Sequence, residues 1–112
     1  MGRGESVETI YSNLQQLSNF ALGNHQDLFV DAVLNIGIPD SAFLQRESRV
    51  RQKRDQINDM LAARTNNQLH YISCPIKYSH KSKNYETDGL HFSELGYAEL
   101  ASHILAPVNS LL

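Results

Sequence analysis

The sequence predicts an α/β fold in which two parallel strands are flanked by helices. Apolar residues recur at helical spacing in three segments, and two short segments rich in β-branched residues separate those helices. The resulting order is helix, strand, helix, strand, loop, helix, and strands that alternate with helices form parallel sheets. The 112 residues allow at most one domain. Two strands make a small sheet with open edges, so we expect the chain to be part of a larger α/β domain.

The first helix is predicted between Ser6 and Gly23. Ser6 is a good N-cap residue, Glu8 complements the positive end of the helix dipole, and Gly23-Asn24 is typical of a helix end. One apolar stripe follows from the spacing of Val7, Ile10, Tyr11, Leu14, Leu17 and Ala21. We expect this stripe to face the core.

Two strands are predicted from their apolar, β-branched character. Residues 28–38 are nearly continuously apolar and end at Pro39, which is typical of a buried strand in a parallel sheet. Residues 69–73 form a shorter strand after the turn at Asn66 and Asn67. Residues 77–87 are polar, lysine-rich and without periodicity, so we expect a mobile loop there.

A middle helix is predicted over residues 48–65, with sparse core contacts from Val50, Ile57 and Leu61. Basic residues cluster around its start, at Arg46, Arg49, Arg51, Lys53 and Arg54. A phosphate or nucleic-acid site needs aromatic or glycine-rich neighbours, which this run lacks. We interpret the basic run as a solvated helix face.

The last helix is predicted to begin near Ser93. Its apolar face consists of Tyr97, Ala98, Ala101, Ile104, Leu105 and Val108. Pro107 removes the hydrogen bond to the carbonyl of His103, so the helix should kink or end there.

Composition excludes several classes of partner. The formal net charge of -2 gives no electrostatic reason to expect nucleic acid or an anionic membrane. The longest apolar stretch, residues 28–38, is interrupted by Asp31 and Asn35 and is too short to span a bilayer. The first residues lack the apolar region of a signal peptide, and the compartment stays open.

No cofactor or metal site is predicted. The sequence lacks a P-loop, a dinucleotide fingerprint and a G-x-S-x-G motif. The histidines His25, His70, His80 and His103 show no metal-ligand spacing with one another or with Cys74. Cys74 is the only cysteine, which excludes an internal disulfide, and we interpret it as a small buried side chain rather than a reactive thiol.

Asp88 and His91 are the candidate catalytic residues. The acid lies three residues before the histidine, next to Gly89, in a segment that leads into the last helix. A carboxylate beside an imidazole fixes its tautomer and stabilises its protonated form, as a general base requires. The alternative is a histidine near a helix start that bonds to Asp88 for structural reasons.

The ten residues from Asp88 to Tyr97, DGLHFSELGY, resemble the last block of the SGNH/GDSL hydrolases, an esterase and lipase family. Residues 32–39, 56–62 and 70–72 are similar to the preceding strand, helix and strand of that family. The resemblance implies a partial three-layer α/β/α sandwich of flavodoxin-like type, with residues 1–112 as the C-terminal portion of the domain. It also implies that His91 is the general base, that Asp88 orients it, and that the substrate is a small acyl ester.

The family's nucleophilic serine is not identifiable in this chain. That serine lies in a Gly-Asp-Ser turn after a strand, whereas Gly4-Glu5-Ser6 follows no strand and Ser6 is explained as an N-cap. Alignment of residues 2–5 with the family's later G-x-N-D block puts Gly4 where an asparagine donates to the oxyanion. A single lost donor costs ~10²–10³ in turnover, so we expect little or no esterase activity from these residues alone.

Three interpretations remain at this stage. The first is an incomplete hydrolase whose serine comes from an upstream segment or a partner chain. The second is a non-catalytic interaction or regulatory remnant whose exposed sheet edge pairs with a partner chain that completes the sheet. The third is an unstable fragment with no function of its own.

Overall fold

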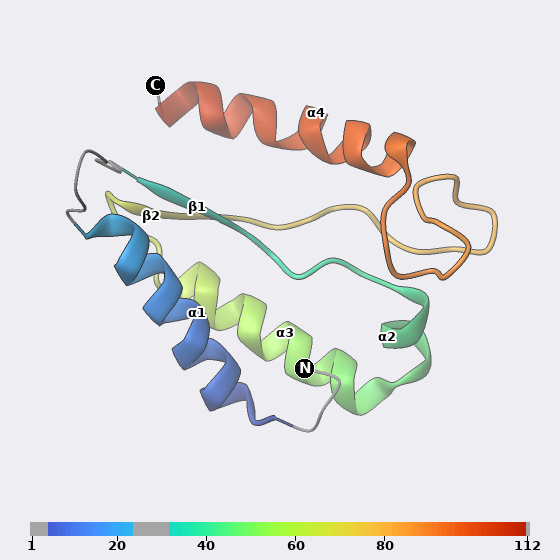
Figure 1. Ribbon diagram of the computed structural model, residues 1–112, viewed down its shortest axis with the longest axis horizontal. Coiled ribbons are helices and arrows are strands. Elements are labelled where there is room, and N and C mark those ends of the chain that lie inside the picture. Colours follow the sequence, from blue (N-terminus) through green and yellow to red (C-terminus); the bar gives the residue numbers. More distant parts are fainter. Residues whose placement is uncertain (1–4, 24–31, 112) are drawn as a thin grey trace.

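The computed structural model describes residues 5–23 and 32–111 and confirms a mixed helix and strand fold (Figure 1). Its elements are α1 (Val7–Leu22), β1 (Val33–Ile36), α2 (Ala42–Arg46), α3 (Ser48–Ala63), β2 (Leu69–Ile72) and α4 (Glu94–Leu111). In Figure 1, α1 and α3 lie on one side of the two strands and α4 lies on the other. Helices therefore flank the sheet on both sides, as the sequence predicts.

Strands β1 and β2 are parallel, with Val33 opposite Leu69 and Ile36 opposite Ile72. Hydrogen bonds of 2.8 Å from the Val33 amide to the Gln68 carbonyl and from the Gly37 amide to the Ile72 carbonyl bracket the pairing. Within the described residues 32–38 of the predicted first strand, only Val33–Ile36 has strand geometry, so the prediction extends too far at its end. Its residues 28–31 lie outside the described part. The predicted second strand is confirmed to within one residue.

The side chain of Asn58 fastens the end of β1 to α3. The Ile38 amide donates to Asn58 Oδ1 at 2.9 Å, and Asn58 Nδ2 donates to the Ile38 carbonyl at 3.2 Å. The amide group thus bonds both backbone groups of Ile38, as the peptide unit of a neighbouring strand would. This pairing holds the strand exit in a fixed position over the helix.

Helices α1 and α3 pack together and confirm most of the predicted contacts. Ser6 Oγ accepts a hydrogen bond from the Thr9 amide at 3.1 Å, so the predicted N-cap is correct. In α3, Ile57 is fully buried and Leu61 is nearly so. The predicted stripe of α1 is wrong at Leu17, which is exposed, while the neighbouring Ser18 is buried.

Helix α2 was not predicted. It is one turn long, too short to show a hydrophobic period, and it begins where Ser41 Oγ accepts a hydrogen bond from the Leu44 amide at 3.1 Å. Ser41 and Leu44 are both buried. This short helix determines how the chain leaves β1.

The segment after β2 contributes to the core although its composition predicts a mobile loop. Buried Ile76, Tyr85 and Phe92 form a cluster against which Cys74, Tyr78 and Leu100 pack. The rings of Tyr85 and Phe92 meet edge to face at 5.1 Å, a favourable arrangement of aromatic quadrupoles. Residues 77–87 form no helix, as predicted, but they are held by packing.

Helix α4 departs from prediction in two respects. Of the two outcomes predicted at Pro107, a kink or an end, the end is wrong, because helical geometry continues to Leu111. Its predicted apolar face is wrong at Tyr97 and Leu105, which are exposed, whereas Leu100 packs against the cluster. Gly96 allows the first turn of α4 to lie against the backbone carbonyl of Asn84, which a Cβ at this position would overlap.

Replacing Asn58 by alanine should weaken the fold. The Asn58→Ala substitution leaves the part-buried amide and carbonyl of Ile38 without their partners, and the two losses together should cost ~1–3 kcal/mol. We expect the free energy of unfolding, measured by urea titration followed by circular dichroism, to fall by about that amount. Gln56→Ala, at an exposed position of the same helix, is the control. Equal stability of both variants would contradict the role assigned to Asn58.

Candidate functional site

Asp88 and His91 form a closed hydrogen-bonded turn immediately before α4. His91 Nδ1 donates to Asp88 Oδ2 at 2.6 Å. The other carboxylate oxygen, Oδ1, accepts from the amides of Leu90 at 2.8 Å and His91 at 3.0 Å. The structure therefore brings together the two residues that the sequence predicts, and three donors fix the carboxylate.

Gly89 gives this turn its shape. Its φ of 66° lies in the left-handed region, which residues with a side chain rarely adopt. The Gly89 amide donates to the Glu86 carbonyl at 2.9 Å, and the Gly89 carbonyl accepts from the Ala42 amide at 2.9 Å. A Cβ at Gly89 would lie 2.7 Å from the Cβ of Ala42. The turn is thus seated directly on the first residue of α2.

Hydrogen bonding lowers the pKa of Asp88 from 3.8 to about 2. The bond from His91 is the largest cause, followed by the bonds from the backbone amides of Leu90 and His91. The side chains of Asp88 and His91 are 47% and 68% exposed, so solvent screens their attraction. The pair therefore fixes the orientation of the His91 ring and adds little to the stability of the fold.

The orientation leaves one ring nitrogen of His91 available for proton transfer. Because an ionised carboxylate only accepts, Nδ1 carries the hydrogen, and the neutral ring then has its lone pair on Nε2. Within residues 5–23 and 32–111, Nε2 has no hydrogen-bond partner. This is the arrangement that a general base requires.

Ser6 is not placed to work with His91. Its hydroxyl donates to Thr9 Oγ1 at 2.9 Å while it caps α1. Lys53 Nζ donates to the Glu5 carbonyl at 3.2 Å, which holds the start of α1 against α3. His91 lies in the turn that leads into α4, and α4 lies on the other side of the strands from α1 (Figure 1). Gly2, Arg3 and Gly4, with the proposed oxyanion alignment, lie outside the described residues.

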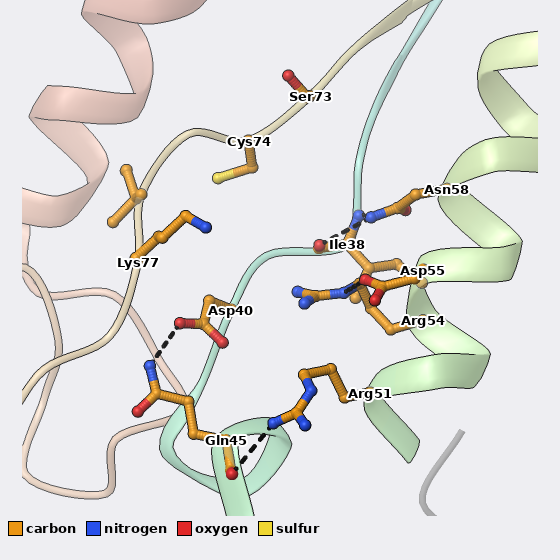
Figure 2. Close-up of a pocket in the computed structure, with 11 residues that line it drawn as sticks. Ile38, Asp40, Gln45, Arg51, Arg54, Asp55, Asn58, Ser73, Cys74 and Lys77 are labelled. Carbon is orange, nitrogen blue, oxygen red and sulfur yellow. Dashed lines mark hydrogen bonds and ion pairs between the residues drawn. The ribbon is translucent and has the colours of Figure 1, made fainter. Parts of the chain in front are cut away.

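A polar cavity of about 320 Å³ opens beyond the carboxyl ends of β1 and β2. Figure 2 shows Arg54 and Lys77 reaching into it from opposite sides. The Arg54 side chain is only 15% exposed and donates from Nε to Asp55 Oδ1 at 2.7 Å, so the expectation of a solvated helix face is wrong at this residue. Arg51 donates from Nη1 to the Gln45 carbonyl at 3.2 Å and stabilises the end of α2. Neither Asp88 nor His91 lines this cavity.

Asp40 connects this cavity to the rest of the site, and sequence reasoning missed it. Its Oδ2 accepts from Gln45 Nε2 and from the Tyr78 amide, both at 2.8 Å, and its carbonyl accepts from Tyr85 Oη at 2.7 Å. Burial and then the nearby Asp40 charge raise the pKa of Tyr85 to about 12, so its hydroxyl stays a donor. The available signal was its position, since an acid directly after Pro39 lies at the carboxyl end of a parallel strand.

The remaining candidates have structural roles. Cys74 is partly buried, and burial raises the pKa of its thiol, which favours the protonated, unreactive form. On α4, His103 Nε2 lies 3.9 Å from Glu99 Oε1. The ring of His80 packs edge-on against the ring of Tyr78. His25 lies outside the described residues.

In the part of the chain that the structure describes, no three His, Cys, Asp or Glu side chains gather where they could hold a metal ion. No helix in that part has the length and apolar character that crossing a bilayer demands. The chain has no match among family models, curated proteins or solved structures.

The depressed pKa of Asp88 should depend on His91. We expect a carboxyl ¹³C NMR titration to give a midpoint near 2, and His91→Ala to move it upward but keep it below 3.8, because two backbone donors remain. Since the folded-state pKa is the lower one, any stabilisation by the pair is present above about pH 4 and is lost as the pH falls toward 2. His103→Ala is the control that should leave the midpoint unchanged. A midpoint at 3.8 in the unsubstituted chain would contradict the geometry.

A side chain at position 89 should distort the turn. Gly89→Ala places a Cβ against Ala42 and forces a left-handed backbone, which costs ~1–2 kcal/mol by itself. We expect lower unfolding free energy and an upward shift of the Asp88 midpoint as His91 leaves its position. The double variant with Ala42→Gly removes the overlap with Ala42 but leaves the tight contact with the Tyr78 ring and the backbone strain, so it should recover only part of the stability. Full recovery would show that the left-handed conformation contributes nothing.

Proposed function

We propose that this chain carries the acid–base half of a serine ester hydrolase of the SGNH/GDSL type. The hydrogen bond from His91 Nδ1 to Asp88 Oδ2, with Nε2 left available, is the observation that supports the proposal most directly. In this proposal His91 is the general base and Asp88 is the residue that orients it. The nucleophilic serine comes from a segment outside these residues.

The proposed reaction transfers one acyl group in two steps. The serine hydroxyl gives its proton to His91 Nε2 while its oxygen forms a bond to the ester carbonyl carbon. The imidazolium, beside the Asp88 carboxylate, then protonates the departing alkoxide as the ester C–O bond breaks. Water attacks the acyl-enzyme by the same proton route, which releases the acid and restores the serine.

The sheet supplies a place for the missing segment. β1 pairs with β2 along one of its two edges. Alternate residues of β1 bond to β2, beginning with the Val33 amide and ending with the Gly37 amide. In a parallel pair the intervening residues, Leu34 and Ile36, direct their backbone groups to the other edge. A strand added there would extend the sheet toward the three-layer sandwich of the family, and its carboxyl end would meet the end at which β1 and β2 finish.

A second candidate function is a non-catalytic interaction module. It is favoured by large apolar side chains that remain exposed on α1 and α4, among them Leu17, Leu95 and Leu105. Exposed apolar side chains of this kind favour partner contact. Under this alternative a partner chain pairs with the edge of β1 and His91 has no chemical role.

Hydrolysis of p-nitrophenyl acetate distinguishes the two functions. The protein to test is the chain extended by the polypeptide encoded directly upstream of residue 1. We expect His91→Ala to lower its turnover by ~10²–10⁴, the usual contribution of general-base catalysis, and we expect the 112-residue chain alone to remain at the buffer rate.

His103→Ala is the matched control, because His103 also lies beside a carboxylate but on the exposed surface of α4. It should leave turnover unchanged. Equal rates for the extended protein and its His91→Ala variant would contradict the proposed hydrolase. So would an upstream sequence with no serine after a strand.

A further inference from the structure

An apolar cavity of about 500 Å³ lies against the Asp88 turn and shares Ile38 and Asp40 with the polar cavity of Figure 2. It is bounded by the exit of β1, by α2, by the first turn of α3 and by the turn itself. Its apolar lining consists of Ile38, Pro39, Phe43, Leu44, Val50 and Leu90. Cavities of roughly 300–1,000 Å³ are typical of small-molecule sites, so the volume suits a small ligand.

We infer that this cavity binds the hydrocarbon chain of a neutral acyl ester. The inference rests on the proposed hydrolase function and names its substrate class, a medium-chain acyl ester. Leu90 lines the cavity and is the residue directly before His91. Asp88, the residue that orients the base, also lines the cavity, so a hydrocarbon chain lying there is next to the acid–base pair.

The exposed apolar side chains of the lining indicate the kind of ligand that the cavity binds. Leu44 forms a buried part of the wall, while Phe43 and Leu90 are 40% and 56% exposed. Large apolar side chains gain from burial in proportion to the area that they remove from water. A flexible hydrocarbon chain would cover Phe43 and Leu90 together and gain from removing their apolar surface from water, whereas a polar ligand would not.

The charges on the lining select a neutral ligand. Its two ionisable residues are Asp40 and Asp88, and no lysine or arginine is among the lining residues. The hydrogen bonds to Asp88 favour its ionised form, so a second carboxylate would be repelled. An ester is uncharged, while the free fatty acid is an anion. The cavity thus favours the substrate over the acid that hydrolysis releases.

A backbone hydrogen bond links the wall of the cavity to the turn that carries the catalytic pair. The bond from the Ala42 amide to the Gly89 carbonyl links the start of α2, which carries Phe43 and Leu44, to the turn that carries Asp88 and His91. Binding of a hydrocarbon chain along α2 therefore affects the position of His91. This coupling makes chain length a determinant of turnover as well as of affinity in the proposed enzyme.

Binding of straight-chain 2-alkanones to the 112-residue chain tests the inference without requiring hydrolysis. These ketones are neutral and carry the hydrocarbon chain of an acyl ester. In a titration followed by amide NMR, we expect shifts confined to residues 38–50 and 88–91, and affinity that rises about fourfold per methylene from 2-pentanone to 2-nonanone. Octanoate should bind more weakly than 2-nonanone at neutral pH.

Variants locate the bound chain. Phe43→Ala and Leu90→Ala should each weaken 2-nonanone binding by about tenfold, as expected for removal of a large apolar contact. Leu105→Ala removes a side chain of matching size and exposure, 60% against 56% for Leu90, and should have no effect. Absent binding, equal loss in all three variants, or tighter binding of octanoate would overturn the inference.

Failure of the inference is distinguishable from failure of the proposed hydrolase. Ketone binding at the cavity with no His91-dependent turnover in the extended protein would refute the hydrolase and leave an apolar-chain site. His91-dependent turnover that is the same for acetate and octanoate esters would support the hydrolase and overturn the assignment of this cavity.

Discussion

The site depends on the way Asp40 secures the chain just beyond β1. One carboxylate oxygen accepts hydrogen bonds from Gln45 on α2 and from the amide of Tyr78 in the segment after β2, while the carbonyl of the same residue accepts from Tyr85. These three bonds join the strand exit, the short helix and the long connecting segment at one point. Because the Asp88 turn is seated on Ala42, its position follows from the position of α2. Asp40 thus contributes to the position of the turn in the fold, in addition to the bonds within the turn itself.

The features that could be predicted from sequence have their signals in short segments of the chain. The ends of α1, the contacts of Ile57 and Leu61, and the parallel strands follow from caps and periodicity over a few residues. The Asp88–His91 pair was predictable for the same reason, since a spacing of three lets one turn bring the groups together. The esterase resemblance itself remains a prediction.

The features that escaped prediction depend on contacts between distant parts of the chain. Tyr85 looks like a loop residue in sequence and is buried because Phe92 and Ile76 meet it. Arg54 belongs to a charged run but lies in a cavity because β1 and β2 end beside it. The exposed face of α4 was mistaken for its apolar packing face, since Leu100 rather than Leu105 meets the cluster. Hydropathy indicates which side chains favour burial, but not which neighbours are there to bury them.

The exposure of His91 has a consequence for how the proposed enzyme must be built. An ion pair that is largely in water is screened by the solvent. What the turn supplies is a fixed tautomer and direction for Nε2, which becomes effective only when a nucleophile is held against it and water is excluded. The segment that brings the serine must therefore also cover His91, and β1 offers that segment an edge on which to pair. The apolar cavity supports the same requirement from the other side, because a hydrocarbon chain lying against Leu90 would remove water from the residue adjacent to the base. In this proposal catalysis arises when the added strand and the bound acyl chain enclose an acid–base pair that the local sequence has already oriented.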